Sequence, residues 1–140
     1  MGRAQAGTRS KFDIVSETFE RWSRGDREVR KADVHPEAVV VSQLANRTYH
    51  GYAGIRQWTE EVLGSFDEWE MEIEQRRELP GDGLLVIGTV HLRGRSSGVD
   101  LEAPCGWLFD FRDGRMARLE IFLNRVDEAL AAAARRELGG

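Results

Sequence analysis

Hydrophobic spacing in the first half of the chain predicts three helices and one strand. One helical face consists of residues spaced by three or four positions, namely Phe12, Val15, Phe19 and Trp22. Gly25 ends this helix, and a short second helix is expected over about residues 27–32. A β-branched segment at about 38–44 predicts a strand, and renewed helical spacing predicts a third helix over about 52–66.

The second half of the chain predicts four strands joined by short turns, followed by a helix. The first of these strands alternates strictly, with Trp69, Met71 and Ile73 on one face and Glu70, Glu72 and Glu74 on the other. Such alternation is typical of a strand with one solvated face, here over residues 68–79. Further strands are expected over 84–95, 99–111 and 115–124, and an alanine-rich helix over 126–138.

This order of elements predicts the α+β class. Consecutive strands with tight turns form an antiparallel sheet, and grouped helices cover one of its faces. We therefore expect a cone-shaped, curved antiparallel sheet wrapped by three to four helices. Residues 1–10 are small, polar and basic, so we interpret them as a flexible N-terminal tail. Residues 11–140 are then a single domain.

Composition narrows the functional classes without choosing among them. The 140 residues fit one domain of ordinary size, and the net charge of −4 argues against a nucleic-acid binder. No apolar run approaches the ~18 residues of a membrane span, and the lone Cys105 suits the reducing cytoplasm. Neither a nucleotide-binding glycine motif nor a metal-ligand spacing is present, so no cofactor and no metal are expected.

Four short segments carry a resemblance to a known family. They are Arg24-Gly25-Asp26, His35-Pro36-Glu37-Ala38, Tyr49-His50-Gly51-Tyr52-Ala53-Gly54-Ile55 and Phe111-Arg112-Asp113-Gly114-Arg115-Met116-Ala117-Arg118. In this order, and over about residues 11–134, they resemble the SnoaL-like, ketosteroid-isomerase-like branch of the nuclear transport factor 2-like superfamily. The resemblance implies a cone-shaped fold with a deep pocket for a small hydrophobic molecule. It also implies a homodimer formed through the outer face of the sheet.

The catalytic residues of two groups of relatives are missing at the matching positions. In a ketosteroid isomerase, the carboxylate base and the tyrosine of the oxyanion hole would stand where this chain has Ser42 and Thr18. The aspartate of that hole falls on Trp107, or on Gly106 if the register differs by one. The polyketide cyclases use a histidine and an aspartate on the last strand, and these positions fall near Leu119 and Ile121, which are both apolar. A one-residue shift in register would bring Glu120 inward instead.

The catalytic residues of a third group of relatives, the limonene epoxide hydrolases, are also missing at the matching positions. Their Arg–Asp pair falls near Thr89 and His91, and their second aspartate falls near Ile121. The tyrosine and asparagine that hold water in those enzymes fall near Val40 and Ser42. This chain therefore lacks the known catalytic sets, and its chemistry must be sought in other residues.

Alternation along two strands predicts the wall of the expected pocket. One strand would present Leu85, Ile87, Thr89, His91 and Arg93, and the next would present Ala103, Cys105, Trp107 and Phe109. Hydrophobic walls with a few polar groups are typical of small-molecule sites. The residues expected to bind the ligand are Trp22, Val40, Trp58, Thr89, Arg93, Cys105, Trp107 and Ile121.

His91 and Ser42 are the candidate catalytic residues. Histidine exchanges protons near neutral pH, so His91 would act as acid or base while Ser42 and the Trp107 indole orient the substrate. The predicted function is a SnoaL-like protein that binds a small hydrophobic molecule and performs cofactor-free acid–base chemistry. The alternative is a non-catalytic binding or dimeric assembly module whose outer sheet face carries Val86, Val90 and Leu92.

Overall fold

The computed structural model describes residues 9–43, 45–96 and 98–139. In chain order the elements are α1 (Lys11–Ser23), β1 (Val34–Ser42), β2 (Arg47–His50), α2 (Gly51–Glu61), the short 3₁₀ helix η1 (Leu63–Ser65), β3 (Phe66–Leu79), β4 (Gly83–Gly94), β5 (Asp100–Arg112), β6 (Arg115–Leu123) and α3 (Val126–Gly139). Most of the predicted flexible tail, residues 1–8, lies outside the described residues. None of the helices described is long and apolar enough to cross a membrane.

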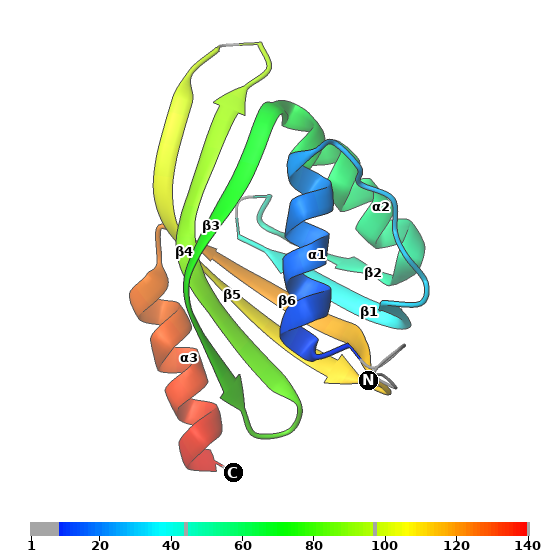
Figure 1. Cartoon of the computed structure of the whole chain (residues 1–140), viewed down its shortest axis with the longest axis vertical. Coiled ribbons are helices and arrows are strands. Elements are labelled where there is room, and N and C mark those ends of the chain that lie inside the picture. The colour runs from blue at the N-terminus through cyan, green and yellow to red at the C-terminus, as the bar shows by residue number, and fades with distance from the viewer. Residues whose placement is uncertain (1–8, 44, 97, 140) are drawn as a thin grey trace, which may run out of the picture.

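Six strands form one curved sheet in the order β2-β1-β6-β5-β4-β3 (Figure 1). The α+β class is confirmed, and the sheet is mixed because β1 runs parallel to β6 while the other pairs are antiparallel. A bulge in β3 between Ile73 and Gln75 lies opposite Gly88. A Cβ at Gly88 would overlap the Glu72 carbonyl, so this close approach of two strands requires glycine.

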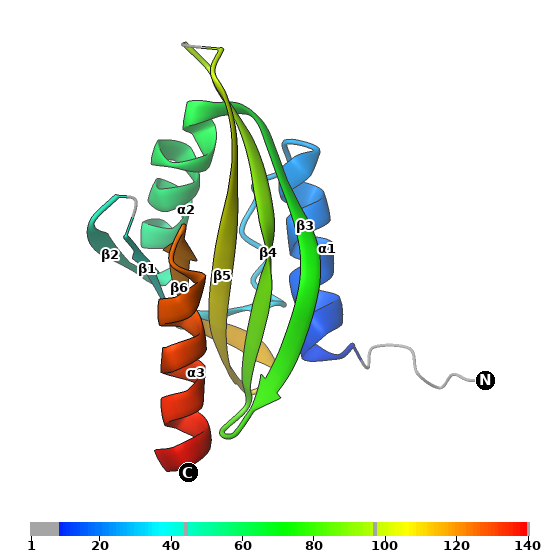
Figure 2. The ribbon, with the colours of Figure 1, turned by 90° about the vertical axis from the view of Figure 1, so that its left-hand side faces the viewer.

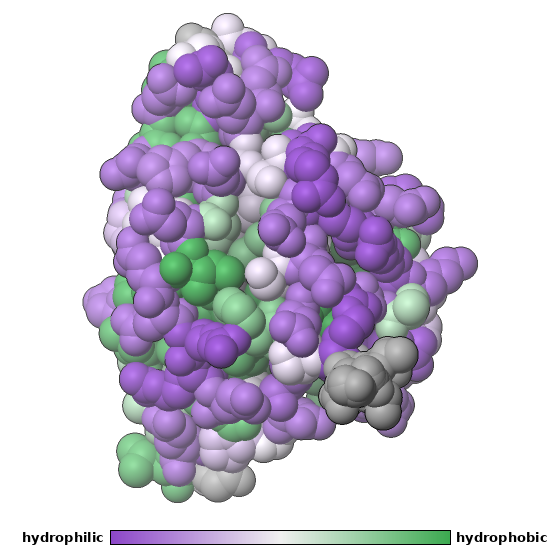
Figure 3. Space-filling view, viewed as in Figure 1, coloured by the Kyte–Doolittle hydropathy of each residue, from purple (hydrophilic) through white to green (hydrophobic). Residues whose placement is uncertain are grey.

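The helices lie on both faces of the sheet. On the inner face, defined as the one covered by α1 and α2, the strands pack against a large hydrophobic core. On the outer face α3 covers a second core, formed by Leu79, Leu85, Ile87, Leu108, Phe122, Ala129 and Ala133. Figure 2 shows α3 in front of the sheet and α1 beyond it. Figure 3 shows mostly hydrophilic residues on the surface of α1 and α2 that faces away from the sheet. The expectation that the helices cover one face is therefore wrong for α3.

The faces of β4 are the reverse of those predicted. In the antiparallel register Val86 lies opposite Trp107 and Val90 opposite Ala103, and residues directly opposite each other share a face. The inner core accordingly contains Leu84, Val86, Val90 and Leu92. Placing Val86, Val90 and Leu92 on the outer face was therefore wrong. A homodimer through that face stays a prediction, and α3 already occupies part of the surface it would use.

The segment between α1 and β1 is irregular where a second helix was expected. The Arg21 side chain is only 5% exposed, and its Nη1 donates to the Glu28 carbonyl at 3.1 Å. The Asp26 amide donates to the Arg21 carbonyl at 2.8 Å. The Glu28 carbonyl, which a helix over residues 27–32 would use for itself, thus accepts from a side chain, and residues 26–30 form neither helix nor strand.

Candidate ligand-binding site

An aromatic cluster fills the space between the inner face and the two helices. Phe19 packs edge-on against Trp107 with 4.8 Å between ring centroids, and Trp22 packs against Trp58 at 5.5 Å. Trp69 lies 5.9 Å from Trp107 at an interplanar angle of 89°. Aromatic rings favour such tilted contacts, and each ring fixes the orientation of its neighbours. The interior is thus bounded by large, mutually restrained rings contributed by α1, α2, β3 and β5.

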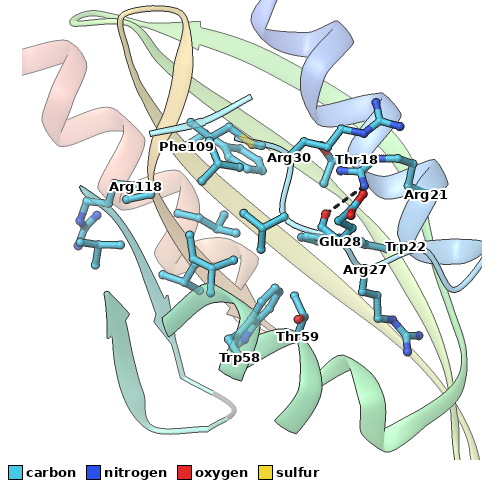
Figure 4. Close-up of a pocket in the computed structure, with 18 residues that line it drawn as sticks. Thr18, Arg21, Trp22, Arg27, Glu28, Arg30, Trp58, Thr59, Phe109 and Arg118 are labelled. Carbon is cyan, nitrogen blue, oxygen red and sulfur yellow. Dashed lines mark hydrogen bonds between the residues drawn. The ribbon is translucent and has the colours of Figure 1, made fainter. Parts of the chain in front are cut away.

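A first cavity of about 50 Å³ lies between α1, α2 and the strands β1, β5 and β6. Its hydrophobic wall includes Trp22, Val34, Val40, Ile55, Trp58 and Phe109. Four charged residues, Arg21, Arg27, Glu28 and Arg30, lie at one side of the lining in Figure 4, and Arg118 lies at the opposite side. The cavity therefore has an apolar interior and a charged margin.

A second cavity of about 40 Å³ follows further along the interior. Its lining includes Ser42, Trp69, Val90, Cys105, Trp107 and Ile121. Trp58 lines both cavities, so this one ring stands between them. Among the described residues that line the second cavity, none is an Asp, Glu, His, Lys or Arg.

The interior contains buried hydrogen-bond donors without acceptors. The indole Nε1 atoms of Trp58 and Trp107 are both buried and have no oxygen or nitrogen acceptor among the described residues; near the Trp107 N–H lies only the Cys105 sulfur, a weak acceptor. An unpaired buried N–H costs about 1–3 kcal/mol, so these donors would gain from an acceptor brought by a ligand. Ser42 adds a hydroxyl group, whose oxygen accepts from the Ala45 amide at 3.3 Å.

Cys105 offers no nucleophile at neutral pH. Burial raises the pKa of its thiol to about 12, an effect that the adjacent Trp107 side chain only partly offsets. The thiol points toward the Gly106 carbonyl, with 3.8 Å between sulfur and oxygen. Because the thiolate is the reactive species, Cys105 serves the second cavity as a neutral wall residue.

The structure brings seven of the ten predicted site residues to the two cavities. Trp22 and Val40 line the first cavity, Trp58 lines both, and Ser42, Cys105, Trp107 and Ile121 line the second. Their roles in binding or catalysis stay predictions. Ile121 faces the interior, whereas the Glu120 carboxylate is 3.4 Å from Nη1 of Arg118, so the open question of register in β6 is answered.

The other three predicted site residues lie on the outer face. Nδ1 of His91 is 3.0 Å from the Glu102 carboxylate, and the Thr89 hydroxyl donates to Glu74 at 2.8 Å. Arg93 pairs with Asp100 at 2.9 Å, a contact that raises the pKa of its guanidinium. The prediction that His91, Thr89 and Arg93 face the pocket is wrong, because the inner positions of this strand belong to Val90 and Leu92.

The sequence interpretation missed the arginines at the first cavity. Arg21 follows Ile14 and Thr18 at helical spacing, so its place on the buried side of α1 could have been read from the sequence. Arg27 belongs to an irregular segment and has no such signal. In the part of the chain that the structure describes, no group of three or more His, Cys, Asp or Glu side chains is placed to hold a metal.

The sequence profile of the SnoaL-like domain family matches residues 15–119, from the middle of α1 to β6. The chain belongs to the SnoaL-like family. This match confirms the resemblance seen in the sequence segments. No functionally curated protein matches this SnoaL-like chain significantly.

Solved structures confirm the fold of the SnoaL-like domain. A ketosteroid isomerase-like protein from Catenulispora acidiphila DSM 44928, in complex with trimethylamine, is 13% identical with a TM-score of 0.72, over 90% of this chain and 95% of that one. TerC, co-crystallised with polyporic acid, is 20% identical with a TM-score of 0.70, over 87% and 95%. A Pseudomonas putida KT2440 protein, provisionally named a polyketide cyclase, is 16% identical with a TM-score of 0.72, over 87% and 97%. Identities this low establish the fold alone.

Proposed function

We propose that this SnoaL-like domain binds a small hydrophobic molecule that carries a hydrogen-bond acceptor, and holds it in the aromatic interior. The observation that carries the proposal is the pair of buried, unpartnered indole N–H groups of Trp58 and Trp107. A ligand with a carbonyl or ether oxygen would satisfy one of these donors while its apolar part replaces empty space.

The character of the donors favours one class of ligand over another. The structural neighbours hold molecules as different as trimethylamine and polyporic acid, so the fold does not select the ligand. Indole N–H groups donate and do not accept, and they therefore disfavour a protonated amine. The interior of this chain suits a neutral acceptor.

The size of the cavities implies that the interior opens when a ligand enters. Cavities of about 50 and 40 Å³ are smaller than the ~150 Å³ that holds a benzene molecule in an engineered protein cavity. Trp58 is the one described residue that lines both cavities. Movement of this ring would join them, so we expect binding to disturb Trp58 before any other side chain.

The lining favours binding over acid–base catalysis. Proton transfer requires a titratable group within hydrogen-bond reach of the reacting atom. The described lining of the second cavity contains no such group apart from the neutral Cys105 thiol, and His91 lies on the other side of the sheet. Glu28, the carboxylate that lines the first cavity, is solvent-exposed at its charged margin rather than buried in its apolar interior. Of the two functions drawn from the sequence, the non-catalytic binding module therefore has the stronger geometric support.

A matched pair of probes tests the proposal. Cyclohexanone and methylcyclohexane have the same number of heavy atoms and differ by the carbonyl acceptor. We expect cyclohexanone to quench the tryptophan fluorescence and raise Tm, and to bind more tightly than methylcyclohexane. Trp107→Phe keeps a ring but removes the N–H donor together with part of the ring volume, so it should lower the preference for cyclohexanone over methylcyclohexane about two- to tenfold.

Trp69→Phe is the matched control, because Trp69 lines the same cavity and its N–H is not among the buried unpaired donors. This variant removes a similar volume from the same cavity, so it should keep the parent chain's preference for cyclohexanone over methylcyclohexane. Absence of any fluorescence or Tm response to cyclohexanone at saturating concentration would refute the proposed function. Equal loss in the two variants would refute the role of the indole donor.

A further inference from the structure

We infer that the natural ligand is amphiphilic, with an anionic group held by Arg27 outside the first cavity and a hydrophobic body inside it. This inference rests on the proposed function and adds the charge of the ligand and the route by which it enters. It is carried by the continuity of the first cavity with a surface groove and by the unpaired charge at their boundary.

A surface groove of about 620 Å³ lies between the 27–31 segment and α2. Four residues line both this groove and the first cavity, namely Arg27, Glu28, Val29 and Thr59. The groove and the cavity are thus separated by a single layer of side chains. Three of the four residues belong to the irregular segment and Thr59 to α2, so this layer is a route by which a ligand in the groove could enter the aromatic interior.

Arg27 and Glu28 are the charged residues of that layer, and of the two only Arg27 has a buried polar side-chain atom without a hydrogen-bond partner. In the described part of the chain its guanidinium forms no ion pair, and its Nε is buried without a hydrogen-bond partner. Burial and the nearby positive charge of Arg95 lower the pKa of Arg27. In Figure 4 the side chain extends away from the middle of the lining residues, so an anion could reach it from the groove.

The neighbouring arginine differs in this respect. Arg21 is held by the Glu28 carbonyl at 3.1 Å and lies 3.6 Å from the Asp26 carboxylate. The Arg21 guanidinium therefore already has partners within the protein, and its contacts hold the irregular segment in place. Arg27 belongs to the same segment, and its guanidinium is free to bind an anionic group of a ligand.

The other charged residues of the groove also favour an anionic ligand, by an excess of one positive group. Lys31 and Arg56 line it together with Arg27, and the carboxylates of Glu28 and Glu60 line it as well. Positive groups are in excess, and a guanidinium can bind a carboxylate through two parallel hydrogen bonds. A carboxylate attached to a hydrophobic body matches a cationic groove that opens on an apolar cavity.

Two further probes test the inference. The carboxylate 3-cyclohexylpropionate and the alcohol 3-cyclohexylpropan-1-ol share one hydrophobic body and differ in charge. We expect the acid to bind about tenfold more tightly than the alcohol, as measured by tryptophan fluorescence titration. Arg27→Gln should abolish that difference by weakening only the acid. Arg24→Gln removes an exposed arginine that lines neither space, and should leave it intact.

Salt dependence in the parent chain provides a measurement that needs no variant. Raising NaCl from 50 to 500 mM should weaken the acid severalfold and leave the alcohol unchanged. Equal affinity of acid and alcohol, or equal losses in Arg27→Gln and Arg24→Gln, would overturn the inference. Cyclohexanone binding would then still support the proposed function. If cyclohexanone also fails to bind, both proposals fall.

Discussion

Gly106 in β5 controls how closely α3 can approach the outer face. A Cβ placed on Gly106 would lie 2.5 Å from the Cβ of Ala129, which is fully buried. Ordinary contacts between such carbons are 3.5–4.0 Å, so Gly106→Ala forces α3 and the sheet apart by about 1 Å. The helix is also fixed by Ala133 and by the Arg136–Asp110 pair, so it cannot shift without strain.

The expected destabilisation follows from two opposing terms. Inserting a methyl group into a packed contact costs about 1–3 kcal/mol. Replacing glycine restricts the unfolded chain and returns about 0.4–1 kcal/mol, since the φ of Gly106 is not in the left-handed region. We therefore expect Gly106→Ala to lower the free energy of unfolding by about 1–2 kcal/mol.

A double-mutant cycle separates this contact from other effects of the substitution. Ala129→Gly alone should cost about 1 kcal/mol, because glycine is a poor residue inside a helix. In the double variant the added methyl group on β5 occupies the space vacated on α3, so urea unfolding should show a favourable coupling of about 1–2 kcal/mol. Additive losses with no coupling would show that α3 does not pack on Gly106 as described.

Three more predictions concern the interior and the outer face. Relative to Cys105→Ala, the parent chain should lose about 1 kcal/mol of unfolding free energy between pH 8 and 10. The unfolded thiol releases its proton near its ordinary pKa of 9.0, whereas burial raises the pKa of folded Cys105 to about 12. Urea titrations that run parallel for the two chains would contradict this. His91→Gln should leave cyclohexanone affinity within twofold, because His91 contacts Glu102 on the outer face; a tenfold loss would refute that position. Arg136→Gln should destabilise the chain by about 1–2 kcal/mol by leaving the partly buried Asp110 carboxylate unpaired, and an unchanged urea midpoint would show that the pair contributes nothing.

Elements with a strong periodic pattern could be predicted from the sequence. The spacing of Phe12, Val15, Phe19 and Trp22 defines the buried side of α1, and the glutamates of β3 mark its solvated face. The hairpins after β3 and β5 carry turn residues that tolerate positive φ, including Gly81 and Gly114. Short connections then give the neighbours from β3 to β6 and the β1–β2 pair, whereas the parallel pairing of β1 with β6 joins distant parts of the chain and has no such signal.

The face of β4 could have been predicted, although its first half is ambiguous. Leu84, Leu85, Val86 and Ile87 are apolar on both faces because α3 covers one side and the aromatic cluster covers the other. In its second half the polar Thr89, His91 and Arg93 alternate with Val90 and Leu92, a pattern that indicates polar residues outward. The family resemblance instead assigned the polar set to the pocket side, and because side chains alternate with a period of two, every residue of the strand was then placed on the wrong face.

The functional groups inferred from the structure lie where local sequence patterns carry the least information. The unpaired N–H groups belong to Trp58 and Trp107, which any hydrophobicity pattern counts as core residues. The unpaired cation belongs to Arg27, in a segment whose irregular shape depends on a tertiary contact from the buried Arg21 to the Glu28 carbonyl. In each case the property that suits a ligand is the absence of a partner within the fold. Such an absence arises only when the elements are packed together, because it is the packing that removes water from these donors and leaves them without an acceptor.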